Sequence, residues 1–121
     1  MRFFKNFLLI TFFITLLSSC SKDEKISFIK ETRQDLEMIA AYKEGYEALE
    51  RNDTFYAAKK FLEAELLYPQ SRWASKSALM AAYSYYIQNY YAEAIANLER
   101  YLKTYPTDDN LDYAYYLIAM C

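Results

Sequence analysis

An internal repeat with a period of 37 residues is the feature that most constrains the fold. Tyr68-Pro69 recurs as Tyr105-Pro106 at this spacing, and Gly45 falls on Ala82, which a second shift brings to Ala119. A self-similar period of about 20–50 residues indicates stacked units that bury their apolar faces against one another. The apolar residues inside each unit recur at helical spacing, and a proline ends each unit. The sequence therefore predicts an all-α fold built of repeated helical hairpins.

Within each unit, the order of a small residue, an alanine, a large residue and a proline resembles the tetratricopeptide repeat (TPR). In the second helix of the units the alanine is Ala57 or Ala94, and the large residue is Phe61 or Leu98. The alternative is an unrelated helical bundle with accidental self-similarity. Because a solenoid generally needs three or more units, we expect the chain to be a piece of a longer protein. The resemblance implies a TPR-type solenoid of about two and a half repeats in residues 32–121, with repeats at about 38–74, 75–111 and 112–121.

Polar side chains predict where the helices begin. Thr32, followed by Asp35 three residues later, is expected to start the first helix. A side-chain oxygen just before a helix accepts a hydrogen bond from an amide that has no partner inside the helix. The expected caps of later helices are Asp53 or Thr54, then Ser71, then Asp108 or Asp109.

The first twenty residues have the parts of a secretory signal peptide. Arg2 and Lys5 precede an apolar run over 7–17, which is well short of the ~20 residues of a transmembrane helix. The segment Leu17-Ser18-Ser19-Cys20 resembles the bacterial lipobox. That resemblance implies a signal peptide over 1–19, a lipidated Cys20 and a tether over 20–31, and Ser at position 21 implies sorting to the outer membrane. The alternative is an ordinary signal peptide with an incidental cysteine.

Composition argues against catalysis. The chain has no histidine, which is the usual general base and the commonest metal ligand, and its single glycine excludes a glycine-rich phosphate loop. Loss of Arg2 and Lys5 with the signal takes the formal net charge from −2 to −4, which does not suit nucleic acid. We therefore expect no enzyme activity, no catalytic residue, no metal and no cofactor. Carboxylates such as Glu63 and Glu65, and Arg100, are expected on solvated helix faces.

Tyrosines at regular positions predict a binding groove. In a TPR array the first helix of each hairpin lines the concave side. The residues that it exposes there are found by counting along the helix from Gly45, Ala82 and Ala119. Tyrosine offers a broad contact area at a low cost in rotamer entropy, and its hydroxyl can bond to a peptide backbone. The alternative is that these side chains pack against neighbouring repeats. The expected peptide-binding groove consists of Tyr42, Tyr46, Leu49, Leu79, Tyr83, Tyr86 and Tyr116, with Met120 at its end.

A lipobox, a short tether and TPRs of lengthened period together resemble the BamD/ComL family of outer-membrane-protein assembly lipoproteins. The resemblance covers the whole chain, which corresponds to the N-terminal half of a typical member. It implies a lipid-anchored protein on the periplasmic face of the outer membrane. The implied partners are unfolded outer-membrane-protein precursors, a BamA-like barrel protein and other lipoproteins of the assembly complex. The resemblance implies that the barrel protein and the lipoproteins bind through C-terminal repeats that lie beyond this sequence. The segments that carry the resemblance are 68–71, 82–86, 90–95, 100–102, 105–107 and 110–117.

Two other functions stay open at the level of the sequence. Another TPR lipoprotein or periplasmic adaptor, such as a scaffold for cell-wall or pilus assembly, has the same repeats, because a fold does not determine a function. A hydrolase that uses a pair of carboxylates is the less favoured alternative, since no apolar pocket or partner residue accompanies the acidic residues.

Overall fold

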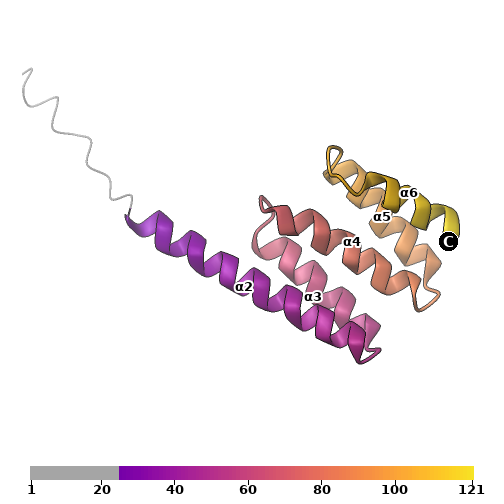
Figure 1. The fold of residues 1–121 in the computed structure, drawn as a ribbon, viewed down its shortest axis with the longest axis horizontal. Coiled ribbons are helices and arrows are strands. Elements are labelled where there is room, and N and C mark those ends of the chain that lie inside the picture. The colour runs from indigo at the N-terminus through magenta and orange to yellow at the C-terminus, as the bar shows by residue number, and fades with distance from the viewer. Residues whose placement is uncertain (1–24) are drawn as a thin grey trace, which may run out of the picture.

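The chain forms a stack of helical hairpins, as the repeat predicts (Figure 1). The structure is a computed structural model that describes the backbone of residues 25–121 and the side chains of residue 33 and of residues 35–121. The predicted signal peptide, the lipobox and Cys20 lie outside these residues. No strand occurs in the described part, and the all-α prediction is confirmed. The helices are α2 (Lys25–Glu50), α3 (Thr54–Leu67), α4 (Arg72–Tyr86), α5 (Tyr91–Thr104) and α6 (Leu111–Met120).

The period of the sequence reappears in the helix boundaries. α3 starts at Thr54 and α5 at Tyr91, and they end at Leu67 and Thr104, so both ends are 37 residues apart. Helix α2 pairs with α3 in the first hairpin, α4 pairs with α5 in the second, and α6 packs on α5 and also reaches α4. Across the joint between the two hairpins, the main packing is that of α3 on α4.

Two asparagines make the tight turns inside the hairpins. Asn52 and Asn89, again 37 residues apart, have φ angles of 61° and 62°. This left-handed conformation is unfavourable for most side chains but is tolerated by asparagine, whose short polar side chain bonds locally. The turns that join successive hairpins use the Tyr-Pro pairs instead. Tyr68 and Tyr105 end α3 and α5 with ψ angles of 75° and 60°, outside the helical region, which is disfavoured for residues that precede proline.

The helix starts confirm some expected caps and correct others. The Asp53 carboxylate accepts from the Tyr56 amide at 3.3 Å, and the Ser71 hydroxyl accepts from the Ala74 amide at 3.2 Å. The start expected at Thr32 is wrong, because α2 already begins at Lys25 and no proline or glycine in between interrupts it. Part of the expected tether is therefore helical.

The cap expected at Asp108 or Asp109 is also wrong, since α6 follows Asn110 and has no side-chain cap. The Asp108 carboxylate instead accepts hydrogen bonds from the turn itself, including one from the Asn110 amide at 2.9 Å.

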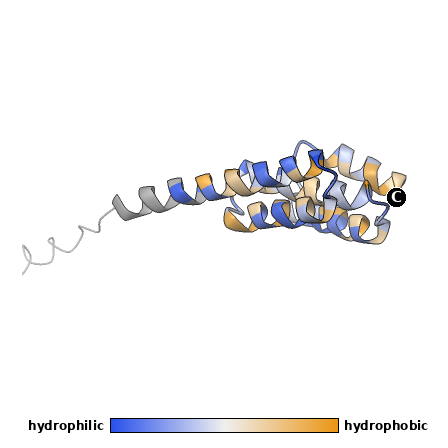
Figure 2. Cartoon of the chain, turned by 90° about the horizontal axis from the view of Figure 1, so that it is seen from below, coloured by the Kyte–Doolittle hydropathy of each residue, from blue (hydrophilic) through white to orange (hydrophobic). Residues whose placement is uncertain are grey.

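The small and large repeat positions form the core. Phe61 and Leu98 are fully buried, and Gly45 and Ala82 are buried on the helices that face them. Burying a side chain as large as that of Phe61 stabilises the fold by about 2–3 kcal/mol. Ala119, the third small position, is exposed instead, because no helix of the described chain covers that side of α6. Figure 2 shows hydrophilic and hydrophobic residues alternating along the helices, which is typical of helices with one buried face.

Candidate functional site

Six tyrosines gather on the first helices of the three units, two on each helix. We call this set the tyrosine face: Tyr42 and Tyr46 of α2, Tyr83 and Tyr86 of α4, and Tyr113 and Tyr116 of α6. Tyr46 is 51% exposed and Tyr116 is 56% exposed. The ring centroids of Tyr83 and Tyr86 lie 6.4 Å apart, and those of Tyr113 and Tyr116 lie 6.2 Å apart. The face therefore presents aromatic surface and phenol hydroxyls together.

The tyrosines of α4 and α6 form one continuous surface. Burial raises the pKa of the Tyr113 hydroxyl, and the neighbouring phenols of Tyr83, Tyr116 and Tyr86 raise it further. Tyr83 and Tyr86 of α4 pack against the core cluster that contains Ala114 and Leu117 of α6, so the aromatic side chains of α4 lie beside α6. In the same way burial, followed by the proximity of Tyr46, raises the pKa of Tyr42. With a raised pKa, the Tyr42 and Tyr113 hydroxyls stay protonated at neutral pH and can donate hydrogen bonds.

Tyr42 is the most firmly held member of the tyrosine face. Its ring makes edge contacts with Phe61 below it, at 5.2 Å between centroids, and with Trp73 of α4, at 5.1 Å. The Lys76 ammonium lies 5.1 Å from the centre of the Trp73 ring and 5.9 Å from that of Tyr42. This aromatic contact joins the first hairpin to the second at the edge of the tyrosine face.

The structure corrects the expected groove at its aliphatic positions. Leu79 is only 7% exposed and belongs to the core around Leu98, so it does not line a surface. Leu49 is half-buried and packs against the core around Phe61. The sequence reasoning missed Tyr113, which lies one helical turn before Tyr116. The spacing of three residues between these two tyrosines is the signal that would have identified it.

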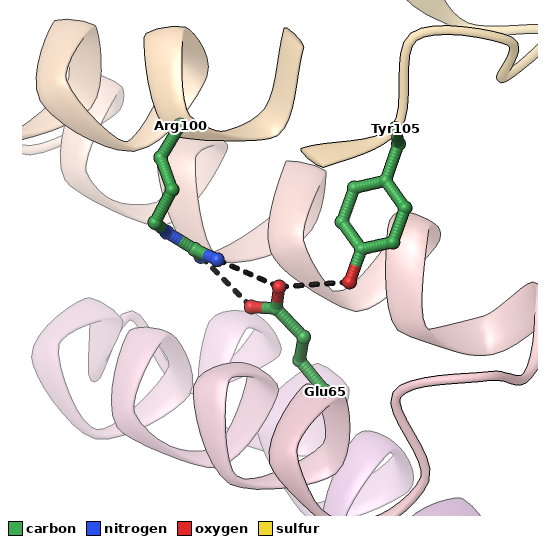
Figure 3. A network of polar contacts seen from close by, with 3 residues as sticks. All are labelled: Glu65, Arg100 and Tyr105. Atoms are coloured by element: carbon green, nitrogen blue, oxygen red, sulfur yellow. Dashed lines mark hydrogen bonds and ion pairs between the residues drawn. The ribbon is translucent and has the colours of Figure 1, made fainter. Parts of the chain in front are cut away.

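Between the second helices of the two hairpins, a carboxylate of α3 links to α5 and to the residue that follows it (Figure 3). Arg100 of α5 donates to Oε1 and Oε2 of Glu65 at 2.7 and 2.8 Å, and the Tyr105 hydroxyl donates to Oε1 at 2.9 Å. The Glu65 side chain is 8% exposed and that of Arg100 is 41% exposed. The expectation that both lie on solvated faces is therefore wrong for Glu65 and only partly right for Arg100. We call these three residues the Glu65 clamp.

A second polar group holds the turn between α5 and α6. The fully buried Tyr101 donates its hydroxyl to Asp108 at 2.6 Å. Burial alone would raise the pKa of Asp108, but the nearby Ser75 hydroxyl and the hydrogen bonds from Tyr101 and Asn110 outweigh it and lower the pKa to about 2. The carboxylate is thus charged at neutral pH and fixes the turn that leads into α6.

An apolar hollow of about 540 Å³ lies on the side of α3. It is open to solvent and lies between α3 and the end of α4. Its lining consists of Lys59, Leu62, Glu63, Leu66, Leu67 and Tyr85. Unlike the tyrosine face, it was not indicated by the repeat.

The described residues contain no group of three or more histidine, cysteine, aspartate or glutamate side chains placed to hold a metal ion. Within the part that the structure describes, every helix is too short or too polar to cross a membrane.

Comparison with known proteins gives one consistent result. Residues 34–121 match the model of the YfiO family, described as outer membrane lipoprotein. A protein of Caulobacter vibrioides is 36% identical over 100 residues, which cover 83% of this chain and 32% of the relative. One of Neisseria meningitidis serogroup A is 32% identical over 101 residues, or 84% and 38% of the two chains. Both carry the name outer membrane protein assembly factor BamD. The chain spans about a third of the length of these curated relatives.

Proposed function

The chain belongs to the YfiO/BamD family of outer membrane lipoproteins, and on this premise we propose that it acts in assembling outer-membrane β-barrel proteins by binding their unfolded precursors. The role is that of a non-catalytic scaffold. The observation that carries the proposal is the tyrosine face, which runs across all three units of the stack.

The chemistry of the tyrosine face suits an extended peptide with aromatic side chains. Paired rings about 6 Å apart can accept an aromatic side chain of the ligand against their outer faces or edges. The phenol hydroxyls can bond to backbone groups of a segment that has not yet paired in a sheet. A barrel precursor offers both features, since its strands are unpaired and its terminal targeting segment is aromatic and strand-like.

We infer the position of the protein in the cell from the resemblance of its N-terminal residues to a lipoprotein signal. Cleavage after Ser19 and lipidation of Cys20 would anchor the chain in the outer membrane with its helices on the periplasmic side. Residues 20–31 would then connect the anchor to the TPR-like domain. The contacts with a BamA-like barrel protein and with other lipoproteins of the complex belong, in this proposal, to the part of the relatives' length that this chain does not span.

Replacing tyrosines of the face tests the proposal. The probe is a short fluorescent peptide with alternating polar and apolar residues that ends in phenylalanine. Tyr46→Ala and Tyr83→Ala should each weaken its binding by about tenfold, as expected for aromatic residues that anchor a ligand. The matched control is Tyr115→Ala, because Tyr115 is an exposed tyrosine of α6 outside the tyrosine face. Equal affinity of all three variants, with helicity preserved in circular dichroism, would show that the face does not bind peptide.

Co-purification distinguishes the proposed role from that of an adaptor in cell-wall or pilus assembly. In this proposal, a full-length form that includes the part of the relatives' length that this chain does not span should be recovered with a BamA-like barrel protein from solubilised outer membranes. Recovery with cell-wall synthesis or pilus components in its place would favour the adaptor.

A further inference from the structure

The joint between the two hairpins combines apolar, aromatic and ionic contacts. Its apolar part is the packing of α3 on α4, where Ala81 shares a core cluster with Phe61. Aromatic contacts are made by the Tyr42 and Trp73 rings and, at the starts of α3 and α5, by the Phe55 and Tyr90 rings. The ionic contact is the Glu65 clamp, near the ends of α3 and α5. Among the side chains that the structure describes, Glu65 and Arg100 form the one ion pair that joins different hairpins, whereas the Lys60–Glu44 pair lies within the first hairpin.

The geometry of the Glu65 clamp restricts the rotation of the two hairpins relative to each other as well as their separation. A guanidinium that donates two parallel hydrogen bonds to one carboxylate fixes the planes of both groups. The third bond, from Tyr105, comes from the residue that ends α5, so the carboxylate is held at two points of the second hairpin. Apolar packing lacks this directionality, because the hydrophobic effect depends on area and not on orientation.

The Glu65 clamp does not belong to the general repeat. A shift of 37 residues takes Glu65 to Leu102, a half-buried apolar residue, and Arg100 corresponds in the first hairpin to Glu63. The equivalent position at the next joint is therefore apolar. A charged group at Glu65 is not needed for packing, since a buried ion pair stabilises a fold little more than apolar residues of the same volume.

We propose that the Glu65 clamp positions the tyrosine face, by fixing the angle between the hairpins and thereby the spacing of the α2 tyrosines from those of α4. The part of this inference that concerns ligand affinity rests on the proposed function. The clamp acts through the hairpins and does not touch the ligand. A hinge that opens at Glu65 would move Tyr46 relative to Tyr83 although neither residue contacts the clamp.

An apolar replacement of the clamp separates positioning from stability. The triple variant Glu65→Leu, Arg100→Met, Tyr105→Phe removes every polar group of the clamp and leaves none unpaired. The matched control is Lys60→Met, Glu63→Leu, which removes the two ion pairs that Lys60 makes with Glu44 and Glu63, each of 3.0 Å and both inside one hairpin. Both are made in the full chain, purified in detergent micelles. Trp73 is the single tryptophan of the chain and lies in the joint, so its fluorescence reports on the angle without any label.

The triple variant should unfold at nearly the wild-type temperature, while acrylamide quenching of Trp73 rises by about twofold and the affinity for the probe peptide falls by about fivefold. The control should change neither quenching nor affinity. Glu65→Gln keeps an oxygen that accepts from Arg100, so its quenching and its peptide affinity should lie between those of the wild type and the triple variant. If the triple variant does not fold, Glu65→Gln takes its place in the experiment.

Unchanged quenching in the triple variant would overturn the inference, because the joint would then keep its angle without the clamp. Increased quenching with unchanged peptide affinity would overturn the link between the clamp and the tyrosine face. If the peptide does not bind the wild-type chain, the proposed function fails, and quenching alone then decides whether the clamp fixes the angle.

Discussion

The contact between Gly45 and Phe61 allows one prediction to be worked out in detail. A Cβ atom added at Gly45 would lie 3.0 Å from Cδ1 and Cε1 of the Phe61 ring and 3.2 Å from its Cγ. Ordinary contacts of this kind measure 3.4–4 Å, so the ring would have to retreat by at least about 0.4 Å. Phe61 is fully buried, and the edge of the Tyr42 ring packs against it. The ring therefore has no free space into which to move.

Two opposing terms determine the stability of Gly45→Ala. Overpacking a filled core costs about 1–3 kcal/mol. Alanine in place of glycine within a helix stabilises by up to about 1 kcal/mol. The steric term is the larger, so the variant should lose about 1 kcal/mol of unfolding free energy, or about 4–8 °C in melting temperature for a domain of this size.

The second hairpin shows how the clash is relieved. There Ala82 and Leu98 occupy the positions of Gly45 and Phe61, which indicates that a methyl group on one helix goes with a smaller side chain on the other. Phe61→Leu alone should cost about 1–2 kcal/mol, because it leaves a cavity. Gly45→Ala combined with Phe61→Leu should be more stable than the sum of the single changes by about 1–2 kcal/mol.

Urea unfolding of the chain from residue 21 onward, followed by circular dichroism, measures all three variants. Ala82→Gly is the matched control, since it removes a methyl group at the equivalent position and should simply destabilise, by about 1 kcal/mol or more. A Gly45→Ala variant that is more stable than wild type, with no coupling to Phe61→Leu, would refute the argument from steric contact.

Two further predictions concern single polar groups. Ser77→Ala should raise the unfolding free energy by about 1 kcal/mol, because the buried Ser77 hydroxyl has no hydrogen-bond partner. Ser84→Ala should not raise it, since the Ser84 hydroxyl donates to the Met80 carbonyl at 2.8 Å. Urea titrations that rank the two variants in the opposite order would contradict this prediction. The folded-state pKa of Asp108 is about 2, below its unfolded value, so its stabilising effect is present above about pH 4 and is lost as the pH falls toward 2. Thermal unfolding between pH 5 and pH 2 should therefore show a larger loss of stability for wild type than for Asp108→Asn, and parallel curves for the two proteins would contradict the assignment.

The sequence predicted the features that depend on local chemistry. The helix boundaries depend on residues whose effect reaches only a few positions along the chain, such as a proline after a helix and a hydroxyl or carboxylate before one. The hairpins, their period and the caps at Asp53 and Ser71 could therefore be predicted. The prediction that the first helix starts at Thr32 rests on the capping side chain of that residue and is wrong. A residue that can cap does not interrupt a helix that continues on both sides of it.

The features that the sequence did not predict depend on tertiary contacts. Glu65 and Arg100 are 35 positions apart, and nothing in either neighbourhood distinguishes Glu65 from the solvated Glu63. Leu79 was assigned to the surface by its position relative to Ala82, but it lies where α4 meets α5 and α6. Which side of a first helix is covered is decided by the next unit in the stack, and this information is not local.

The unequal lengths of the first two helices set a distance. Helix α2 has 26 residues and α3 has 14, so α2 continues for about 12 residues, or about 18 Å, beyond its partner (Figure 1). If Cys20 anchors the chain in the membrane, as proposed, this helical extension would hold the hairpins away from the bilayer. A helix keeps the attached domain at a more constant distance and in fewer orientations than a flexible linker of equal length does. The extension would thereby raise the effective concentration of the tyrosine face at that distance from the membrane.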